Sequence, residues 1–149
     1  MKALPLNCRF HHLGLAVKSA DKAVKLLQLQ GYSVDQPVFD PLQGVHLFWC
    51  AHASMPAVEI IYQTADRGPL DSVLSGKNEL IYHLCYSVDN TDAAIESLTA
   101  AGLRVICVSP EKPATLFAGQ NVSFHYVGGF GLIEFVSPGR QVQPATVSP

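Results

Sequence analysis

The sequence contains one module twice, and this duplication limits the possible folds more than any other feature. Residues 11–18 (HHLGLAVK) and 82–89 (YHLCYSVD) align without a gap. Apolar, acidic and glycine positions then recur at matching offsets in the pairs Val17 and Val88, Asp21 and Asp92, Val24 and Ile95, Leu27 and Leu98, Gly31 and Gly102. Each half ends in an apolar segment that holds one carboxylate, residues 58–61 (VEII) and 131–136 (GLIEFV). The chain is therefore predicted to be a tandem repeat of one supersecondary unit.

The first strand of each repeat has two different faces. Over residues 10–17, period two places His12 with Gly14 and Ala16 on one side, and bulky apolar residues on the other. Residues 80–88 divide in the same way. One side carries His83, Cys85 and Ser87, and the other carries the bulky residues Leu84, Tyr86 and Val88. We expect one face to pack on a core and the other to present an imidazole.

A helix is predicted after each of these strands. Ser19 is the expected N-cap of the first helix, and Gly31 is its expected C-terminal stop. In the second half Asn90 or Thr91 is the expected cap, and Gly102 is the stop. A short helix is also expected within the connector, at residues 70–74.

Each half continues with extended segments, which completes a strand–helix–three-strand unit. The expected strands are residues 32–39, 45–50, 57–62, 103–108, 122–127 and 132–136, with a loop over 109–121. A single unit would leave one sheet face and its edges bare, so two units should pair into one curved sheet. The fold class is thus α+β, built from two βαβββ modules.

At 149 residues, with 48% hydrophobic and 15% charged residues, the chain is expected to form one domain with a real core. The predicted domain covers residues 1–138. It is divided into module one at about 9–63, a connector at 64–79 and module two at about 80–138, and a loose tail is expected at 139–149.

Charge, apolar runs and cysteine content argue against several classes of protein. The formal net charge of −2 argues against nucleic acid or an anionic membrane as the main partner. Residues 1–7 have no apolar run typical of a signal peptide, and no segment is long enough to span a bilayer, so a cytoplasmic protein is expected. The four cysteines form no CxxC pair and are expected to be reduced thiols: Cys8, Cys50, Cys85 and Cys107.

Two repeated polar residues point to a metal site. A carboxylate within a strand as apolar as those holding Glu59 and Glu134 is costly unless something compensates it. A lone strand histidine is more often a packed residue, and a lone strand glutamate usually faces solvent. The recurrence of the pair in both halves favours convergence of His12, His83 and the two carboxylates on one divalent cation. Such nitrogen and oxygen donors suit Zn, Ni, Co, Mn or Fe(II).

The remaining histidines carry weaker signals. His11 precedes His12 and is expected on the opposite face, as a structural or exposed residue. His46 and His52 have no counterpart in the other half, and His125 could line a pocket or merely sit on the sheet.

Three of these segments resemble the vicinal oxygen chelate superfamily, which includes glyoxalase I, methylmalonyl-CoA epimerase, extradiol dioxygenases and bleomycin or fosfomycin resistance proteins. They are residues 12–17 (HLGLAV), 82–89 and 131–136, within a resemblance that covers about residues 9–138. Residues 43–45 (QGV) and 58–61 further resemble the first half of the epimerase.

The resemblance implies a U-shaped mixed sheet with helices on its outer face and a metal in its cleft. It assigns His12, Glu59, His83 and Glu134 as ligands, two from each half. Glu134 is the expected base, and Glu59 its partner or a lasting ligand. Superfamily members often form homodimers. Four aromatic residues are candidate pocket walls, although a plain role in the core is the stronger expectation for each: Phe48, Trp49, Phe124 and Tyr126.

The chain also departs from its relatives. Epimerases of this kind carry a glutamate just before Gln-Gly-Val that serves as one of two bases, and here that position is Leu42. Gln120 stands near a loop where relatives often carry a basic residue, so no coenzyme A phosphate clamp is evident. The longer glutathione-binding signatures of glyoxalase I are also not evident.

These features together predict a metal-dependent isomerase or lyase of glyoxalase or epimerase type, acting on a small thioester or hemithioacetal. A non-catalytic binding protein, like the antibiotic resistance members, is the main alternative. Those members commonly lack the full ligand set, which this chain keeps. An extradiol dioxygenase ranks last, because a fourth ligand would crowd the iron site where oxygen and a catechol must both bind.

Overall fold

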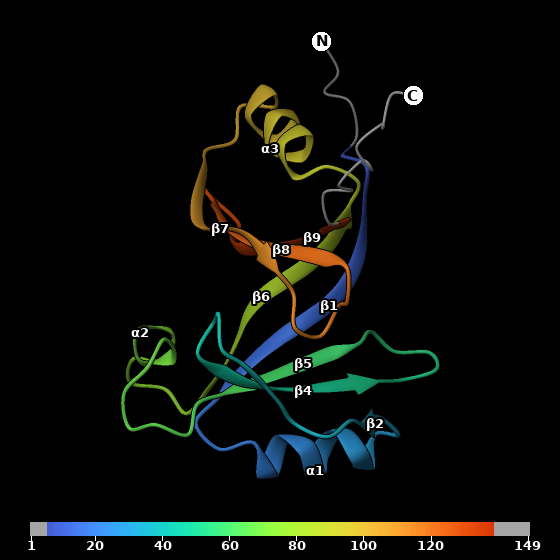
Figure 1. Cartoon of the computed structure of the whole chain (residues 1–149), viewed down its shortest axis with the longest axis vertical. Helices are drawn as coiled ribbons and strands as arrows, with labels where there is room; N and C mark the ends of the chain where they lie inside the picture. The colour runs from blue at the N-terminus through green and yellow to red at the C-terminus, as the bar shows by residue number, and fades with distance from the viewer. Residues whose placement is uncertain (1–5, 139–149) are drawn as a thin grey trace, which may run out of the picture.

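The computed structural model describes residues 6–138, and the predicted tail at 139–149 lies outside them. Its strands form one mixed sheet in the order β2-β4-β5-β1-β6-β9-β8-β7, with β3 paired to β4 (Figure 1). The strands are β1 (Cys8–Val17), β2 (Ser33–Val34), β3 (Val38–Asp40), β4 (Val45–Ala51), β5 (Val58–Tyr62), β6 (Glu79–Val88), β7 (Val105–Pro113), β8 (Gln120–Val127) and β9 (Gly131–Pro138). The helices are α1 (Asp21–Leu29), α2 (Leu70–Val73) and α3 (Thr91–Ala100).

The two halves meet along the long central strands. β1 and β6 pair antiparallel, and each pairs parallel with the last strand of its own half, β1 with β5 and β6 with β9. Gly14 of β1 therefore lies opposite Glu59, and Cys85 of β6 lies opposite Glu134. The duplication read from the sequence becomes a pseudo-symmetric pair of strand ladders, and the predicted α+β class is confirmed.

The helices α1 and α3 lie at opposite ends of the molecule in Figure 1. Leu27 of α1 packs with Val17, Val58 and Ile60 on the sheet face opposite Glu59. In the second half, Ala94 of α3 joins the equivalent cluster, which also contains Val88, Val127, Ile133 and Phe135. Helices α1 and α3 therefore cover the outer face. Leu70 of the short helix α2 instead packs with Ala16 and Ile61, on the face that carries the repeated histidines. No helix among the described residues is long and apolar enough to cross a membrane.

The predicted helix caps have different outcomes. Asn90 caps α3, and its side chain accepts a hydrogen bond from the Ala93 amide at 2.9 Å. The prediction for Ser19 is wrong, because Ala20 occupies the N-cap of α1 and makes no side-chain capping bond. Ala20 is buried in the core beneath α1, so apolar packing rather than capping fixes this end of the helix.

The predicted loop at residues 109–121 is also partly wrong, because β7 continues through Pro110 to Pro113 and β8 already begins at Gln120. Proline cannot donate to a strand ladder and is therefore confined to sheet edges or bulges. β7 is an edge strand paired only with β8, and its register shifts twice, between Cys107 and Ser109 and between Ser109 and Lys112. Both conditions that admit proline are met.

Candidate metal centre

A β-bulge in β1 changes which residues face the site. Along the β1–β6 ladder Phe10 pairs with Tyr86 and His12 pairs with Cys85, so His11 is the extra residue. A bulge places neighbouring side chains on the same side of the strand. The prediction that His11 faces away from His12 is therefore wrong, and the two imidazole centroids lie 5.1 Å apart.

The second half contains the same device in β6. Gly14 pairs with His83 and Leu15 pairs with Ile81, which leaves Tyr82 as the extra residue. The ring centroids of Tyr82 and His83 are 4.4 Å apart. Each repeated histidine is thus preceded by a bulged residue whose ring packs against it.

The four repeated polar side chains converge between the two halves. His12 Nε2 lies 3.2 Å from His83 Nε2 and 3.0 Å from Glu134 Oε1. Glu134 Oε1 is 3.7 Å from His83 Nε2, and Glu59 Oε2 is 3.8 Å from His12 Nε2. His12, His83 and Glu59 each offer one donor atom within 4.8 Å of one another. The structure therefore brings together all four residues that the repeat singled out.

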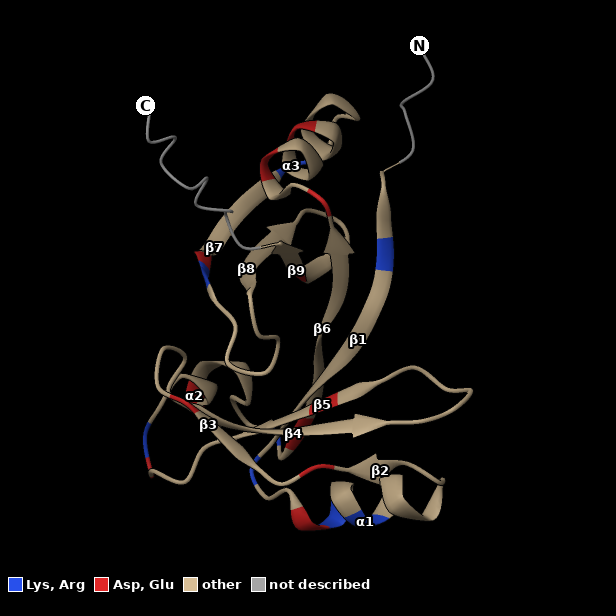
Figure 2. Cartoon of the chain, turned by 45° about the vertical axis from the view of Figure 1, so that its right-hand side comes forward, with Lys and Arg blue, Asp and Glu red and all other residues tan. Residues whose placement is uncertain are grey.

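Burial dominates the electrostatics of this cluster, since none of the four residues is more than 5% exposed. Burial, together with the neighbouring Glu134 carboxylate, raises the pKa of Glu59 to about 8. Burial also raises the pKa of Glu134 to about 7. Burial lowers the pKa of His83 to about 3, and His12 acts in the same direction. Figure 2 shows how few charged residues the sheet carries around the acidic position in β5.

The donor set fits a divalent cation. Glu134 Oε1 is buried and has no hydrogen-bond partner within residues 6–138, although two imidazole nitrogens lie nearby. His12 Nε2 and His83 Nε2 face each other, so at most one hydrogen can lie between them. Buried nitrogen and oxygen lone pairs that accept no hydrogen bond are costly, and one cation could bind all of them.

Gly14 makes room for this arrangement. A Cβ atom built on Gly14 would collide with the His83 imidazole ring, contacting its Cε1, Nδ1 and Nε2 atoms. The His83 ring therefore lies directly over the backbone of the neighbouring strand. The equivalent position of the second half is Cys85, which pairs with His12 and has a side chain. The two halves thus seat their histidines differently.

A cleft of about 240 Å³ lies beside two aromatic residues that pack against His83. Tyr82 and Phe124 line it, and the Phe124 ring centroid is 5.3 Å from that of His83. Leu42 also lines it, together with Lys112 of β7. The cleft is thus lined by residues from both halves of the chain, with Leu42 among those of the first half.

Of the four candidate aromatic walls, Phe124 lines the cleft and the other three do not. The Trp49 ring centroid lies 5.3 Å from that of His12, and Phe124 lies against His83. Phe48 instead stacks on Tyr62, in the cluster on the outer face of the sheet. Tyr126 is exposed near the end of β8.

His125 does not line the cleft. It packs on Phe135, a residue of the outer-face cluster, and its Nε2 lies 3.0 Å from Ser123 Oγ. His46, in turn, stacks on the Tyr62 ring. Of the histidines beyond the repeated pair, only His11 joins the cluster.

Several residues near the centre were not anticipated. Phe117 follows β7 and reaches back to Trp49, at a centroid distance of 5.3 Å. Asp40 is buried and contributes to the raised pKa of both Glu59 and Glu134. Its carboxylate accepts hydrogen bonds from the backbone amides of residues 42 and 43 and from the Gln43 side chain. The turn signal at residues 40–44 could have indicated this role for Asp40.

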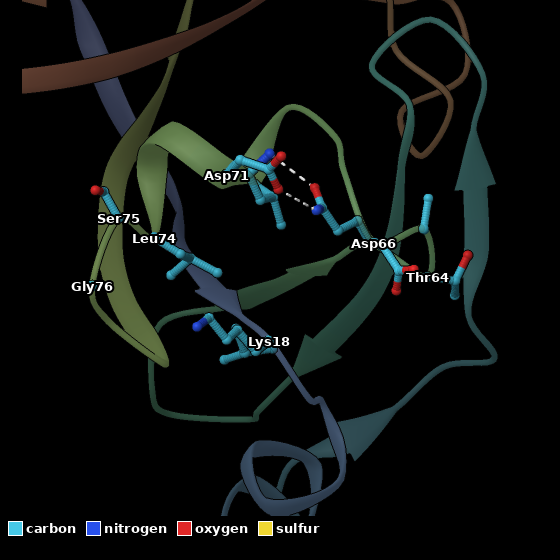
Figure 3. Close-up of a pocket in the computed structure, with 11 residues that line it drawn as sticks. Lys18, Thr64, Asp66, Asp71, Leu74, Ser75 and Gly76 are labelled. Atoms are coloured by element: carbon cyan, nitrogen blue, oxygen red, sulfur yellow. Dashed lines mark hydrogen bonds between the residues drawn. The ribbon is translucent and has the colours of Figure 1, made fainter.

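A larger hollow, about 470 Å³, lies beside α2 and away from the histidines (Figure 3). One of its carboxylates, that of Asp71, accepts hydrogen bonds from Gln63 Nε2 at 2.7 Å and from the Gly68 amide at 3.1 Å. None of the four converging residues lines it. None of them lines the smaller cleft either, but two residues of that cleft, Tyr82 and Phe124, pack against the His83 ring. The candidate site is therefore assigned to the side of the smaller cleft.

Comparison with known proteins agrees with this architecture. A solved methylmalonyl-CoA epimerase from Mycobacterium tuberculosis matches with a TM-score of 0.69 at 20% identity, over 87% of each chain. A hypothetical protein from Bacillus halodurans matches with a TM-score of 0.72 at 18% identity, over 93% of this chain and 99% of its own. A Streptomyces coelicolor methylmalonyl-CoA epimerase variant in complex with 2-nitronate-propionyl-CoA matches with a TM-score of 0.65 at 19% identity, over 87% and 96%.

At these identities the structural matches describe the fold alone. A search of curated protein sequences gave no match. The family model described as Glyoxalase/Bleomycin resistance protein/Dioxygenase superfamily matches residues 11–124, which is most of the chain and includes both repeated histidines and Glu59. The protein therefore belongs to the Glyoxalase/Bleomycin resistance protein/Dioxygenase superfamily, the vicinal oxygen chelate superfamily that its repeated motifs resemble.

Proposed function

We propose that this protein is a divalent-metal-dependent isomerase or lyase of epimerase or glyoxalase type. It would remove a proton next to the carbonyl of a small thioester or hemithioacetal. The observation that carries the proposal is the convergence of two imidazoles and two buried carboxylates, one of each from either half. Superfamily members commonly bind a divalent metal, and the similar epimerase structures include one with a bound coenzyme A thioester analogue.

His12 and His83 would hold the metal through their Nε2 atoms, with Glu59 and Glu134 completing the set. When bound, a divalent cation there supplies Lewis-acid stabilisation of the charge that develops on the substrate oxygen. Glu134 is the proposed base, because a carboxylate ligand that loosens when substrate binds could take the adjacent carbon-bound proton. Glu59 is its partner or stays a ligand.

Leu42 narrows the possible reactions. It lines the cleft where the epimerases place a second base, and a leucine cannot carry a proton. Asp40 is nearby, but its carboxylate is already bonded to the turn that follows it. A two-base epimerisation would therefore need Glu59 opposite Glu134. A reaction in which one carboxylate both removes and returns the proton needs no further group.

The direct test is to assay lactoylglutathione formation and methylmalonyl-CoA epimerisation with Ni, Co, Mn and Zn. We expect turnover with at least one metal, and a fall in kcat of about 10²–10⁴-fold in Glu134→Gln. Glu96→Gln, on the exposed side of α3, is the matched control and should keep full activity. Metal-loaded protein that turns over neither substrate would rule out this substrate class.

A second candidate is binding of a small molecule without turnover, as in the resistance proteins of the superfamily. Leu42 and the largely apolar lining of the cleft favour it. Metal analysis of protein purified without chelator separates the two. Bound metal at one equivalent supports the enzyme, and ligand binding by metal-free protein with no turnover supports the binding protein.

A further inference from the structure

The contact between His11 and His12 is more specific than side-chain packing alone requires. The Nδ1 atoms of the two imidazoles are 2.8 Å apart, the distance of a hydrogen bond. We propose that His11 is a positioning residue that holds His12 with its Nε2 lone pair facing the metal, an inference that rests on the proposed metal site. Nothing in the sequence indicated it, since regular alternation places His11 on the other face.

The two ring nitrogens of His12 have different neighbours. Its Nε2 faces Glu134 Oε1 and the Nε2 of His83, at 3.0 Å and 3.2 Å. A neutral imidazole carries one hydrogen, so an Nε2 that is to bind a metal must leave that hydrogen on Nδ1. The only group that the structure places within hydrogen-bond distance of His12 Nδ1, among the described residues, is His11. With a metal on Nε2, His12 Nδ1 would therefore be the donor and His11 Nδ1 the acceptor.

His11 is well placed to act as a fixed acceptor. Its ring makes an edge contact with Phe117 at a centroid distance of 4.8 Å and lies 5.7 Å from Trp49. The bulge between Phe10 and His12 fixes its backbone. The ring is half-buried between these walls, so its orientation, and with it the position of the accepting nitrogen, is set by packing.

His83 is held in another way, which gives an internal contrast. Its Nδ1 is buried and has no hydrogen-bond partner within residues 6–138, while its ring lies flat over Gly14. Packing against the strand thus orients His83, and a hydrogen bond orients His12. An outer partner of a ligating histidine typically contributes about 10–100-fold in metal affinity. We expect a contribution of that size from His11.

The test compares zinc affinity in two substitutions at this position. His11→Phe keeps a ring against Trp49 and Phe117 but has no acceptor, whereas His11→Asn places an oxygen where Nδ1 lies now. His46→Phe is the matched control, because it removes an imidazole that stacks on Tyr62 outside the cluster. Zinc dissociation constants come from competition with a chromophoric chelator, and unfolding of the metal-free proteins is measured in parallel.

His11→Phe should weaken zinc binding about 10–100-fold, while His11→Asn and His46→Phe stay close to the unaltered chain. All of the metal-free proteins should unfold at similar temperatures. In nitrogen-15 NMR spectra of the zinc-loaded protein, the His12 Nδ1 hydrogen should be protected from exchange in the unaltered chain and in His11→Asn, and exposed to exchange in His11→Phe.

Two results would overturn the inference while leaving the metal centre in place, and a third would overturn it by assigning the metal to another set of ligands. One is zinc binding by His11→Phe as tight as in the unaltered chain, and another is an equal loss in both His11 variants. The third is a thiolate charge-transfer band in the cobalt-loaded protein. His11, His12 and Cys85 also offer donor atoms within 4.8 Å of one another, and such a band would mean that the metal uses that set. An unaltered chain that binds no metal would overturn both proposals.

Discussion

Burial shifts the pKa values of the four side chains at the candidate metal centre. It raises those of the two carboxylates and lowers those of the two imidazoles. Burial without water favours the neutral form of every titratable group. It therefore keeps protons on Glu59 and Glu134 and removes them from His83. In the metal-free protein the cluster is close to neutral overall, whereas a bound cation would favour ionised carboxylates.

These shifts predict how the stability of the metal-free protein depends on pH. Glu59 has a folded pKa of about 8 against an ordinary 4.5, so its stabilising proton is present at low pH and is lost as the pH rises through about 8. The pKa of Glu134, raised to about 7, acts in the same direction. The lowered pKa of His83 acts in the opposite direction, but only below its ordinary 6.5. The free energy of unfolding should therefore fall by about 1–2 kcal/mol between about pH 6.5 and about pH 8.5.

Urea denaturation in the presence of a chelator measures this slope. The double variant Glu59→Gln with Glu134→Gln should lose it, while Glu96→Gln on the exposed side of α3 should retain it. A slope that survives in the double variant would show that other groups produce it.

At the scale of elements, strands whose positions follow from the local apolar pattern were predicted correctly. Features that depend on how one strand pairs with another were not. The apolar alternation of β1, β6 and β9 was visible in the sequence, and the cap at Asn90 was identified by residue type. The extent of β7 was missed, because its prolines are tolerated only at a sheet edge and sequence alone does not say which strand is at the edge. The bulges at His11 and Tyr82 were missed for a related reason, since a bulge exists only relative to a partner strand.

β1 and β6 approach so closely at Gly14 that a single methyl group added there should disturb the site. Gly14→Ala should push the His83 ring off the strand, because the added Cβ would overlap three of its atoms. We expect a loss of about 1–3 kcal/mol in stability from overpacking and a fall in metal affinity of at least about 10-fold, of the size seen when a ligand loses its support.

Gly128→Ala is the matched control for this prediction. A Cβ on Gly128 would meet only the Arg104 side chain at 3.5 Å and its backbone oxygen at 3.7 Å, which are ordinary contacts. Chemical denaturation and zinc competition on both variants measure the effects. Unchanged zinc affinity in Gly14→Ala would mean that the position of the His83 ring does not matter for the site.

At the scale of the whole molecule, the candidate centre joins two halves that are otherwise held by the β1–β6 ladder and by contacts across the cleft. His12 and Glu59 come from the first half, and His83 and Glu134 from the second. A ligand that binds only the folded chain stabilises it by mass action. Metal at about a hundredfold above its dissociation constant should thus add about 2.7 kcal/mol.

The corresponding rise in Tm, about 5–10 °C for a chain of this size, can be followed by thermal unfolding with and without Zn, Ni, Co or Mn. His12→Ala and His83→Ala should each abolish the rise, although they alter different halves. His46→Phe should preserve it. If either alanine variant kept the full shift, the metal would be bound by one half alone.

The sequence by itself determined the duplication, the α+β class and the four polar residues that the fold brings together. These features follow from residue types and from offsets that match between the two modules, and both can be read without knowing how the strands pair. Only the tertiary structure decided that His11 and Tyr82 join those residues and that Leu42 lines the cleft. It also placed Phe48 and His125 on the outer face of the sheet. The physical reason is that β-bulges and strand register are set by pairing between β1 and β6, which lie far apart in the chain. A one-residue bulge moves a side chain to the other face of the sheet, and residue type alone does not reveal where that happens.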